Sequence, residues 1–329
     1  MAESFGDFER RGWEDSAVCA QYDDYFSRIT TRSIGALLDA VHLCDGDHVL
    51  DVATGPGYVA GAAAPRVARV VGVDFSRQQL KRARRRYPSV TFEQGDAGAL
   101  PFESASFDVV ISNYGMPHFP EPDLFLREAF RVLRGAGPLA FTVWDVPSVA
   151  KGLGTVYGAI QRHGSLDVGL PVGPSFFLFS DPGQSHESLA RAGFEAISIT
   201  KVPQLWELPG ADDLFETVLN ATVRAGATLR AQRPEALTAI RESIREAMAG
   251  YSSGGAYQVP MDAVLATAIK PHRDPSSRPG ADRRRGRPAP GADYSYRTTL
   301  RLTSPFSIRS KAWLRSLSGM RRVIISSSL

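Results

Sequence analysis

Cysteine is scarce in this sequence, because the 329 residues contain only Cys19 and Cys44. Two cysteines argue against a disulfide framework or a cysteine-rich metal site, and they fit a protein kept in a reducing compartment. No apolar run approaches the ~20 residues that a helix needs to span a bilayer. The first nine residues are acidic and lack the apolar core of a secretion signal. We therefore expect a cytoplasmic protein without a membrane span.

Basic charge is also missing from most of the chain, although the whole sequence has a formal net charge of +3. Residues 271–329 hold thirteen Lys or Arg against three Asp, which leaves a net charge of −7 on residues 1–270. The main part of the chain therefore has no basic excess that would attract nucleic acid. The tail has no Glu, is rich in Pro, Arg, Gly and Ser, and shows little hydrophobic periodicity. We expect it to be disordered, either without a selected function or as a basic arm for nucleic acid or an anionic membrane.

What the sequence does contain is an apolar strand that runs into a glycine turn at residues 49–58, with the letters VLDVATGPGY. The valines and the leucine predict a buried strand, and Gly55 and Gly57 allow a sharp bend and the close approach of a ligand. Asp51 is a carboxylate inside this apolar strand. Because a buried charge is costly unless it is paired, we expect a cationic or hydrogen-bonding partner. The ammonium group of a small ligand would satisfy Asp51.

Three further apolar segments predict strands, and each has a polar side chain at or next to its end: they are residues 69–74, 90–97 and 106–113. Helical patterns alternate with these strands, which predicts a parallel sheet with helices on both faces. Ligands of such sheets bind beyond the carboxyl ends of the strands. We therefore expect Asp51, Asp74, Asp96 and Asn113 to meet at one edge of the sheet and to line one ligand site.

A series of short motifs extends this pattern along the chain. They are DVATGPG at 51–57, VGVDFS at 71–76, EQGDA at 93–97, LPF at 100–102, SFDVVISN at 106–113 and LREAFRVLR at 126–134. Their order resembles the class I S-adenosylmethionine (SAM)-dependent methyltransferases, and is most similar to the branch with the ubiquinone/menaquinone-biosynthesis C-methyltransferases. The resemblance is specific over residues 46–145, looser from there to about 270, and absent from the tail.

The resemblance implies an α/β fold with a Rossmann-like, doubly wound, mostly parallel sheet of seven strands, helices on both faces and an antiparallel last strand. It also implies four parts: N-terminal helices closing over the cofactor at 1–45, a SAM-binding core at 46–145, the rest of the sheet with a helical lid and substrate insertion at 146–270, and the tail at 271–329. Within these parts the patterns predict two helices in 13–41, a loop-rich segment in 145–183, two helices in 211–249 and the last strand in 259–269.

The resemblance implies a cofactor role for a set of residues at the strand ends. Asp51 with the backbone of the glycine turn would hold the amino-acid portion of SAM, Asp74 the ribose, and Phe75, Asp96 and Ala97 the adenine. The full set that we expect to bind the cofactor is Asp51, Ala53, Gly55, Gly57, Asp74, Phe75, Asp96, Ala97, Asn113 and Tyr22. For Tyr22, simple packing of the ring against the sheet is the alternative. No metal ligand set stands out.

The two candidates for a catalytic base lie in the loop after the fourth strand, and whether a base is used is left open. His118 is the first candidate, because its side chain titrates near neutrality, and Tyr114 is the second. His118 is also open to a different interpretation, as a residue that shapes the site beside the methionine moiety. An apolar loop with Phe176, Phe177 and Phe179, together with a helical stripe of Leu237, Ile240, Ile244 and Met248, predicts a lid over the acceptor or plain core packing.

The sequence thus predicts transfer of a methyl group from SAM to a small, apolar or aromatic metabolite, with the O-, N- or C-acceptor and the oligomeric state left open. One alternative is a SAM-binding protein without methyl transfer, either a cyclisation catalyst or a regulatory binder. Another is a nicotinamide-dinucleotide enzyme, since Gly55-x-Gly57-x-x-Ala60 fits that glycine pattern. Against it, Pro56 removes an N–H that a pyrophosphate would use, and Asp51 would repel the pyrophosphate.

Overall fold

The computed structural model describes residues 3–272 of the chain. The two interpretations of the basic tail concern residues beyond 272 and therefore lie outside the described residues. Between residues 3 and 272 no helix is both long and apolar enough to cross a membrane.

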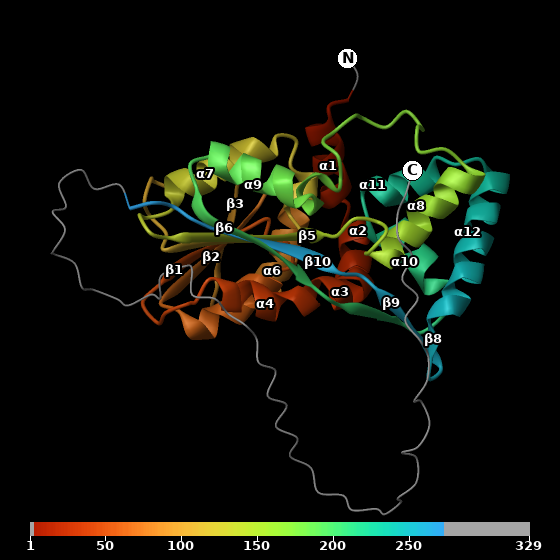
Figure 1. The fold of residues 1–329 in the computed structure, drawn as a ribbon, viewed down its shortest axis with the longest axis horizontal. Coiled ribbons are helices and arrows are strands. Elements are labelled where there is room, and N and C mark those ends of the chain that lie inside the picture. Colours follow the sequence, from red (N-terminus) through yellow and green to blue (C-terminus); the bar gives the residue numbers. More distant parts are fainter. Residues whose placement is uncertain (1–2, 273–329) are drawn as a thin grey trace, which may run out of the picture. The chain divides into compact units, whose positions relative to one another are not determined.

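A seven-stranded sheet with the strand order β3-β2-β1-β4-β5-β10-β6 forms the centre of the fold (Figure 1). β1 pairs in parallel with both β2 and β4, whereas β10 runs antiparallel between β5 and β6. This is the predicted sheet, including its antiparallel last strand. The strands are β1 His48–Val52, β2 Arg69–Asp74, β3 Thr91–Gln94, β4 Val109–Asn113, β5 Pro138–Trp144, β6 Glu195–Val202 and β10 Ala263–Ile269.

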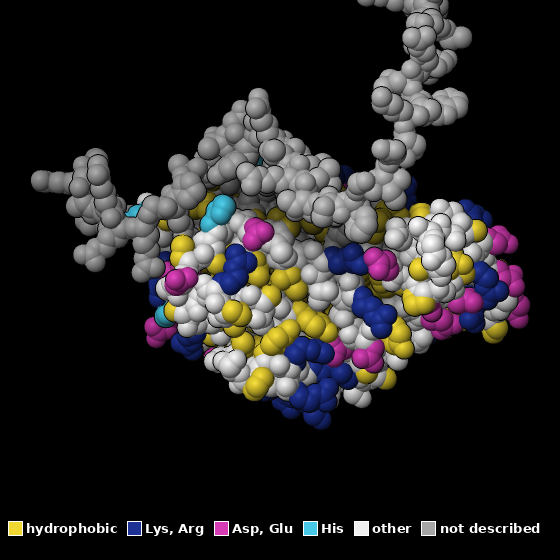
Figure 2. Space-filling view, turned by 90° about the horizontal axis from the view of Figure 1, so that it is seen from below, with side chains coloured by type: hydrophobic (Ala, Val, Ile, Leu, Met, Phe, Trp, Pro, Cys, Tyr) yellow, Lys and Arg dark blue, Asp and Glu magenta, His cyan; other side chains and the backbone are white. Residues whose placement is uncertain are grey.

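Helices cover both faces of this sheet, as the alternating pattern predicts (Figure 1). One face packs against α4 Ile34–Ala40, α5 Tyr58–Ala63 and α6 Arg77–Arg86. The opposite face packs against α7 Pro122–Val132 and α9 Pro182–Arg191. The apolar side chains of the strands are thus buried on both sides, which is the usual arrangement of parallel strands. On the side of the molecule that Figure 2 shows, Lys and Arg are interspersed with Asp and Glu and do not form one continuous basic surface.

The N-terminal segment is more broken than the two helices predicted for residues 13–41. The first helix already begins at Phe5, where Ser4 caps it by accepting a hydrogen bond from the backbone of Asp7. The segment consists of α1 Phe5–Glu14, α2 Ser16–Gln21, a π-helix at Tyr22–Phe26, α3 Ser27–Thr30 and a 3₁₀ turn at Thr31–Ser33, followed by α4. Such π-helical turns are rare in proteins, and those that occur often lie at functional sites.

The prediction of a loop-rich segment at 145–183 is wrong over its first half, which forms helix α8 Lys151–His163. Its glycines lower helix propensity, and they interrupt the apolar periodicity from which a helix is predicted. Two of them allow close packing: a Cβ on Gly152 would lie 2.6 Å from the sulfur of Met261, and one on Gly154 would lie 2.1 Å from the carbonyl oxygen of Pro147.

The region before the last strand also differs from its prediction. Residues 211–249 form three helices rather than two, namely α10 Asp213–Ala221, α11 Arg224–Arg230 and α12 Pro234–Met248. The last strand of the main sheet begins at Ala263 and not at Val259, because Val259 belongs to a separate small sheet. That sheet has the order β7-β9-β8 and consists of β7 Leu205–Leu208, β9 Ala256–Pro260 and β8 Ser252–Ser253.

A chain that ends after His272 should keep its melting temperature within about 3 °C, a shift that corresponds to roughly 1 kcal/mol for a domain of this size. The reason is that β10 is complete at Ile269, and Lys270 closes the edge by donating from its backbone to Gly137 and from its Nζ to Leu133. Differential scanning fluorimetry of the two chains measures the effect. A control that ends at Met261 removes β10 from between β5 and β6 and should fail to fold. A larger loss on ending at His272 would show that residues beyond 272 stabilise the domain.

Candidate active site

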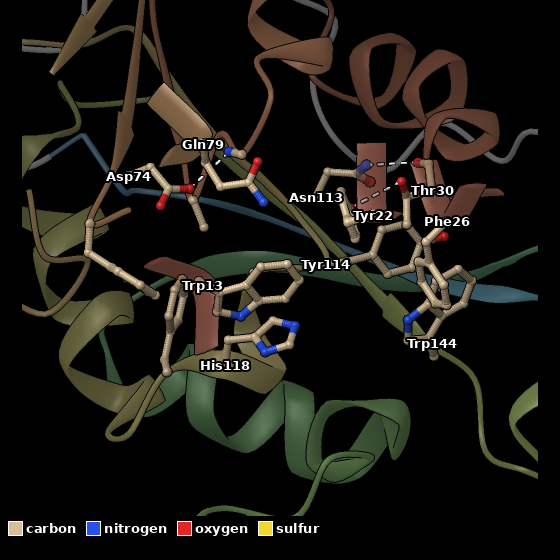
Figure 3. A pocket seen from close by; sticks show the side chains of 15 residues that line it. Trp13, Tyr22, Phe26, Thr30, Asp74, Gln79, Asn113, Tyr114, His118 and Trp144 are labelled. Atoms are coloured by element: carbon tan, nitrogen blue, oxygen red, sulfur yellow. Dashed lines mark hydrogen bonds between the residues drawn. The ribbon is translucent and has the colours of Figure 1, made fainter. Parts of the chain in front are cut away.

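Three cavities lie at the carboxyl ends of β1, β2 and β4, the edge at which the sequence predicts a ligand. The first, which we call the aromatic cavity, has a volume of about 80 Å³. The second, of about 140 Å³, is lined by Asp96 and Ala97, and the third, of about 30 Å³, by Asp51. Ligand pockets usually measure ~300–1,000 Å³, so the N-terminal helices hold this edge closed. The side chains that we use to define the aromatic cavity are Trp13, Tyr22, Phe26, Tyr114, His118 and Trp144 (Figure 3).

The structure brings the residues predicted from sequence to this one region, with a single exception. Eleven of the twelve candidates line at least one of the three cavities. Gly57 does not, because it faces the interior: a Cβ on it would lie 2.8 Å from the ring of Phe92 and 3.0 Å from the Cβ of Ala83. Its left-handed backbone, with φ of 84°, turns the chain into α5. Gly57 therefore shapes the turn from its interior side and does not line any of these cavities.

Asp51 is buried in β1 with an exposed fraction of 1%. Its Oδ2 accepts hydrogen bonds from the Thr54 hydroxyl at 2.6 Å and from the Ala60 backbone N–H at 3.1 Å. Its Oδ1 is equally buried and has no hydrogen-bond partner among the described residues. Burial raises the pKa of the Asp51 carboxyl to about 7, although the two hydrogen bonds oppose this shift. An unpaired carboxylate oxygen in such a place is suited to an incoming cation.

Asp74, at the end of β2, fixes the glycine turn in place. Its Oδ2 accepts from the backbone N–H of Gly55 at 2.9 Å, and its Oδ1 accepts from the backbone N–H of Ser76 at 2.8 Å. Gly55 has a φ of 55°, a conformation that glycine adopts without steric cost. Burial raises the pKa of Asp74 to about 6. Each carboxylate oxygen has a second acceptor position, and the side chain borders the aromatic cavity (Figure 3).

Phe75, Asp96 and Ala97 line the second cavity, where helix α1 reaches over them. The Arg10 guanidinium lies 5.2 Å from the centre of the Phe75 ring and pairs with Asp96 at 3.3 Å. The side chains of Arg10 and Asp96 are about half exposed, and pairs of this kind contribute little to stability. Arg10 is thus held weakly across the opening of this cavity.

Asn113 has its hydrogen-bonding groups engaged within the protein. Its Oδ1 accepts from the hydroxyls of Ser33 at 2.8 Å and Thr142 at 2.5 Å, and its Nδ2 donates to the carbonyl of Thr30 at 2.9 Å. Tyr22 approaches from the π-helix, and its hydroxyl donates to Thr30 Oγ1 at 3.2 Å (Figure 3). Asn113 therefore joins β4 to the N-terminal helices and shapes the cavity wall.

Tyr114 also lines the aromatic cavity, and its backbone is left-handed with a φ of 59°. Its ring stacks on Trp144 with 4.0 Å between ring centres, and its hydroxyl accepts a hydrogen bond from Gln204 Nε2 at 2.6 Å. Burial raises the pKa of the Tyr114 hydroxyl further from neutrality. Since a base must lose its proton near the working pH, this environment makes Tyr114 a poor base.

His118 projects into the aromatic cavity beside Trp13, with the two rings edge to face at 5.2 Å (Figure 3). Its Nδ1 lies 2.9 Å from Oε2 of Glu9, a buried residue of α1 that the sequence reasoning missed. One signal was available, because Glu9 falls on the same helix face as the buried Phe5, Phe8 and Trp13. An acid on an apolar helix face needs a partner, but nothing in the sequence indicates that the partner is His118.

For most of the apolar residues that the sequence assigns either to an acceptor lid or to the core, the structure shows core packing. Phe179 is 4% exposed and meets Phe141 of β5 in the core between the sheet and helices α7 and α9. Phe177 packs against Tyr157 of α8 at 5.9 Å. In the helical stripe, Ile240, Ile244 and Met248 are fully buried in the core that α12 shares with α8. Phe176 alone approaches the site, 6.3 Å from the His118 ring. The structure therefore supports core packing for most of this set.

Comparisons with known proteins agree with this geometry. Residues 49–137 match the model of a family described as a methyltransferase domain. A demethylmenaquinone methyltransferase of Renibacterium salmoninarum is 38% identical over 135 residues, 40% of this chain and 57% of that protein. A 27-O-demethylrifamycin SV methyltransferase of Amycolatopsis mediterranei is 28% identical over 279 residues, 82% of this chain and 95% of that protein.

A solved structure shares the fold. Phosphoethanolamine N-methyltransferase 2 of Haemonchus contortus, in complex with phosphomonomethylethanolamine and S-adenosylhomocysteine, is 20% identical, with a TM-score of 0.51. The match covers 82% of this chain and 61% of that one. The chain spans about half the length of curated relatives such as the R. salmoninarum protein.

The strand order is that of the class I SAM-dependent methyltransferases, and residues 49–137 match a methyltransferase domain. The nicotinamide-dinucleotide alternative is therefore set aside. The residues present fit SAM, because the buried Oδ1 of Asp51, which has no hydrogen-bond partner within residues 3–272, is an acceptor for its ammonium group.

Asp51→Asn should stabilise the ligand-free protein at pH 8 while weakening SAM binding by roughly 1–3 kcal/mol. The folded-state pKa of about 7 exceeds the usual value of 3.8. The folded protein therefore holds a proton that the unfolded chain has lost, and its stability falls as the pH rises between these two values. The variant should lose this contribution to the pH dependence. Thermal unfolding from pH 4 to pH 8 and titration calorimetry with SAM measure the two effects.

The matched control is Asp24→Asn, since Asp24 is exposed on the π-helix. It should leave both measurements unchanged. Parallel stability curves for Asp51→Asn and the unmodified protein, or equal affinity for SAM, would contradict the assignment of Asp51.

Proposed function

We propose that this protein transfers the methyl group of SAM to a small, apolar or aromatic acceptor held in the aromatic cavity. The observation that carries the proposal is the position of this cavity. It lies directly against the carboxyl ends of the strands that carry Asp74 and Asn113, and its other walls are aromatic rings from the N-terminal helices, β5 and the loop after β4. An apolar acceptor bound there would be shielded from water next to the donor.

The chain's own residues suit the donor along the same edge. Asp51 Oδ1 would accept from the ammonium group, Asp74 from the ribose hydroxyls, and Phe75 with Asp96 and Ala97 would border the adenine. SAM supplies a methyl group that its sulfonium has already activated. The main task of the protein is then to hold the acceptor atom in line with the methyl carbon, an orientation effect of up to about 7–11 kcal/mol.

The names of two relatives support a small-molecule acceptor. One is named for demethylmenaquinone and the other for 27-O-demethylrifamycin SV. We extend only the shared part of these names to this chain, which is methyl transfer to a small organic molecule. The aromatic walls of the cavity add the preference for an apolar or aromatic surface, since stacked and edge-to-face ring contacts contribute beyond area burial.

The direct test is to incubate the purified protein with SAM carrying an isotopically labelled methyl group and a panel of phenols, quinols and aryl amines. S-adenosylhomocysteine should form together with a product that contains the label, both detected by mass spectrometry. Binding of SAM without transfer to any member of a broad panel would favour the alternative of a SAM-binding protein that does not methylate.

Phe26→Leu should raise the KM for the acceptor several-fold and leave the affinity for SAM within a few-fold. Phe26 stacks on Tyr22 at 5.8 Å and meets Trp144 edge to face at 5.9 Å, so the smaller side chain should enlarge the aromatic cavity, and Phe26 is not among the residues expected to bind SAM. Steady-state kinetics and calorimetry separate the two effects. Phe177→Leu is the matched control, because Phe177 packs on α8 away from the cavity. An equal rise in KM in both variants would place the acceptor elsewhere.

A further inference from the structure

Glu9 is a carboxylate buried beside the candidate site, and its surroundings are built to hold it there. Its side chain is 2% exposed. Oε2 accepts a hydrogen bond from the indole N–H of Trp13 at 3.2 Å and lies 2.9 Å from Nδ1 of His118. Trp13 is one helical turn further along α1, so the helix itself fixes two of the three side chains in this cluster.

The negative charge of Glu9 is compensated from the opposite side by Arg224 of α11. The Arg224 Nε lies 3.8 Å from Oε1 of Glu9. The guanidinium is itself held in place, because it donates to the carbonyl of Pro174 at 2.9 Å and lies 4.4 Å from the centre of the Phe5 ring. A buried carboxylate with a nearby cation and an indole donor remains an acceptor for hydrogen bonds.

This arrangement decides which ring nitrogen of His118 carries the proton. An ionised carboxylate only accepts, so Nδ1 must donate to Glu9, and the neutral ring then has its lone pair on Nε2. The ring extends into the aromatic cavity, and Figure 3 shows one ring nitrogen directed across it towards Tyr114 and Tyr22. His118 is 24% exposed against 2% for Glu9. The free nitrogen thus faces the space where an acceptor would bind.

We propose that Glu9 is a positioning residue that holds His118 with Nε2 free to remove a proton from the acceptor. The inference rests on the proposed methyl transfer and deepens it. The acceptor X–H gives its proton to Nε2, and a bond forms between X and the methyl carbon. The bond between that carbon and sulfur breaks with its electron pair left on sulfur. The products are the methylated acceptor, S-adenosylhomocysteine and an imidazolium paired with Glu9.

The chemical class of the acceptor follows from this step. A base is useful only where the acceptor holds a removable proton near neutral pH, so the acceptor carries a hydroxyl or an N–H group. An acceptor whose nucleophile is permanently ionised would gain nothing from the pair. The site therefore takes an aromatic or apolar molecule with one ionisable hydroxyl or N–H directed at His118.

Several charged groups face His118 and affect any pH profile. Glu9 on α1 and Arg224 on α11 are the nearest pair, and Asp74 at the end of β2 interacts with the ring electrostatically. Arg10 and Glu121 line the second cavity together with His118. The Glu9 and His118 variants must therefore be compared with the substitution of a histidine that lies outside this cluster.

The first test needs no acceptor. The ¹⁵N shifts of the histidine side chains in labelled protein report the tautomer of His118, once its signals are assigned by their loss in His118→Gln. The unmodified protein should carry the proton on Nδ1. Glu9→Leu, which has no acceptor at that position, should lose this preference, and Glu9→Gln, which keeps one, should retain part of it. Calorimetry with SAM shows whether the donor site is intact in each variant.

The second test uses a series of substituted phenols of decreasing acidity as acceptors. His118→Gln should lower kcat by about 100- to 10,000-fold for the least acidic phenols. The loss should shrink for phenols that are already ionised at the assay pH. Glu9→Leu should show the same dependence on acidity with a smaller loss, and Glu9→Gln a smaller one still. The control His186→Gln, at an exposed position of α9, should behave as the unmodified protein.

Each outcome decides one question. Transfer with a loss that is the same for every phenol, or a His118 tautomer that ignores Glu9, would overturn the inference and leave the proposed function standing. Binding of SAM by the unmodified protein without transfer to any phenol, quinol or aryl amine would overturn the proposed function, and the base assignment with it.

Discussion

A carboxylate in the middle of an apolar sheet is the constraint on which the rest of this structure depends. Asp51 lies between two parallel neighbours of β1, with one oxygen satisfied by Thr54 and Ala60 and the other left without a partner among the described residues. The surrounding turn cannot relax to hydrate it, because Asp74 holds Gly55 by its backbone. The protein therefore keeps a destabilising group at the point where a cationic ligand would repay its cost.

The N-terminal helices complete the site that the sheet begins. They contribute three of the rings that define the aromatic cavity and the buried Glu9 beside His118. The π-helix fastens them to the sheet domain, since Asp23 pairs with Arg86 at 2.9 Å and accepts from the Tyr58 hydroxyl at 2.6 Å. Because a π-turn adds a residue to a helical turn, it lets Tyr22 and Phe26 face the cavity while Asp23 faces the domain.

The parts that could be predicted from sequence are those with local signals. The first four strands and the polar side chains at their ends follow from runs of apolar residues and from glycine turns, and the antiparallel last strand from family resemblance. Helix α8 was missed because its glycines serve packing partners distant in the sequence, such as Met261. The choice between a lid and core packing stayed open because an apolar stripe has the same pattern whether it faces a ligand or α8. Glu9 was missed because 109 residues separate it from His118.

The same long separations affect the order in which the chain can fold. Helix α1 leaves the ribosome long before α11 does, yet a Cβ on Gly12 would clash with Val223, and Glu9 meets Arg224. More than two hundred residues must be synthesised before these partners exist, and closing so long a loop is costly in entropy. During synthesis the amphipathic α1 must therefore wait with Phe5, Phe8 and Trp13 uncovered, a state in which nascent chains depend on chaperones.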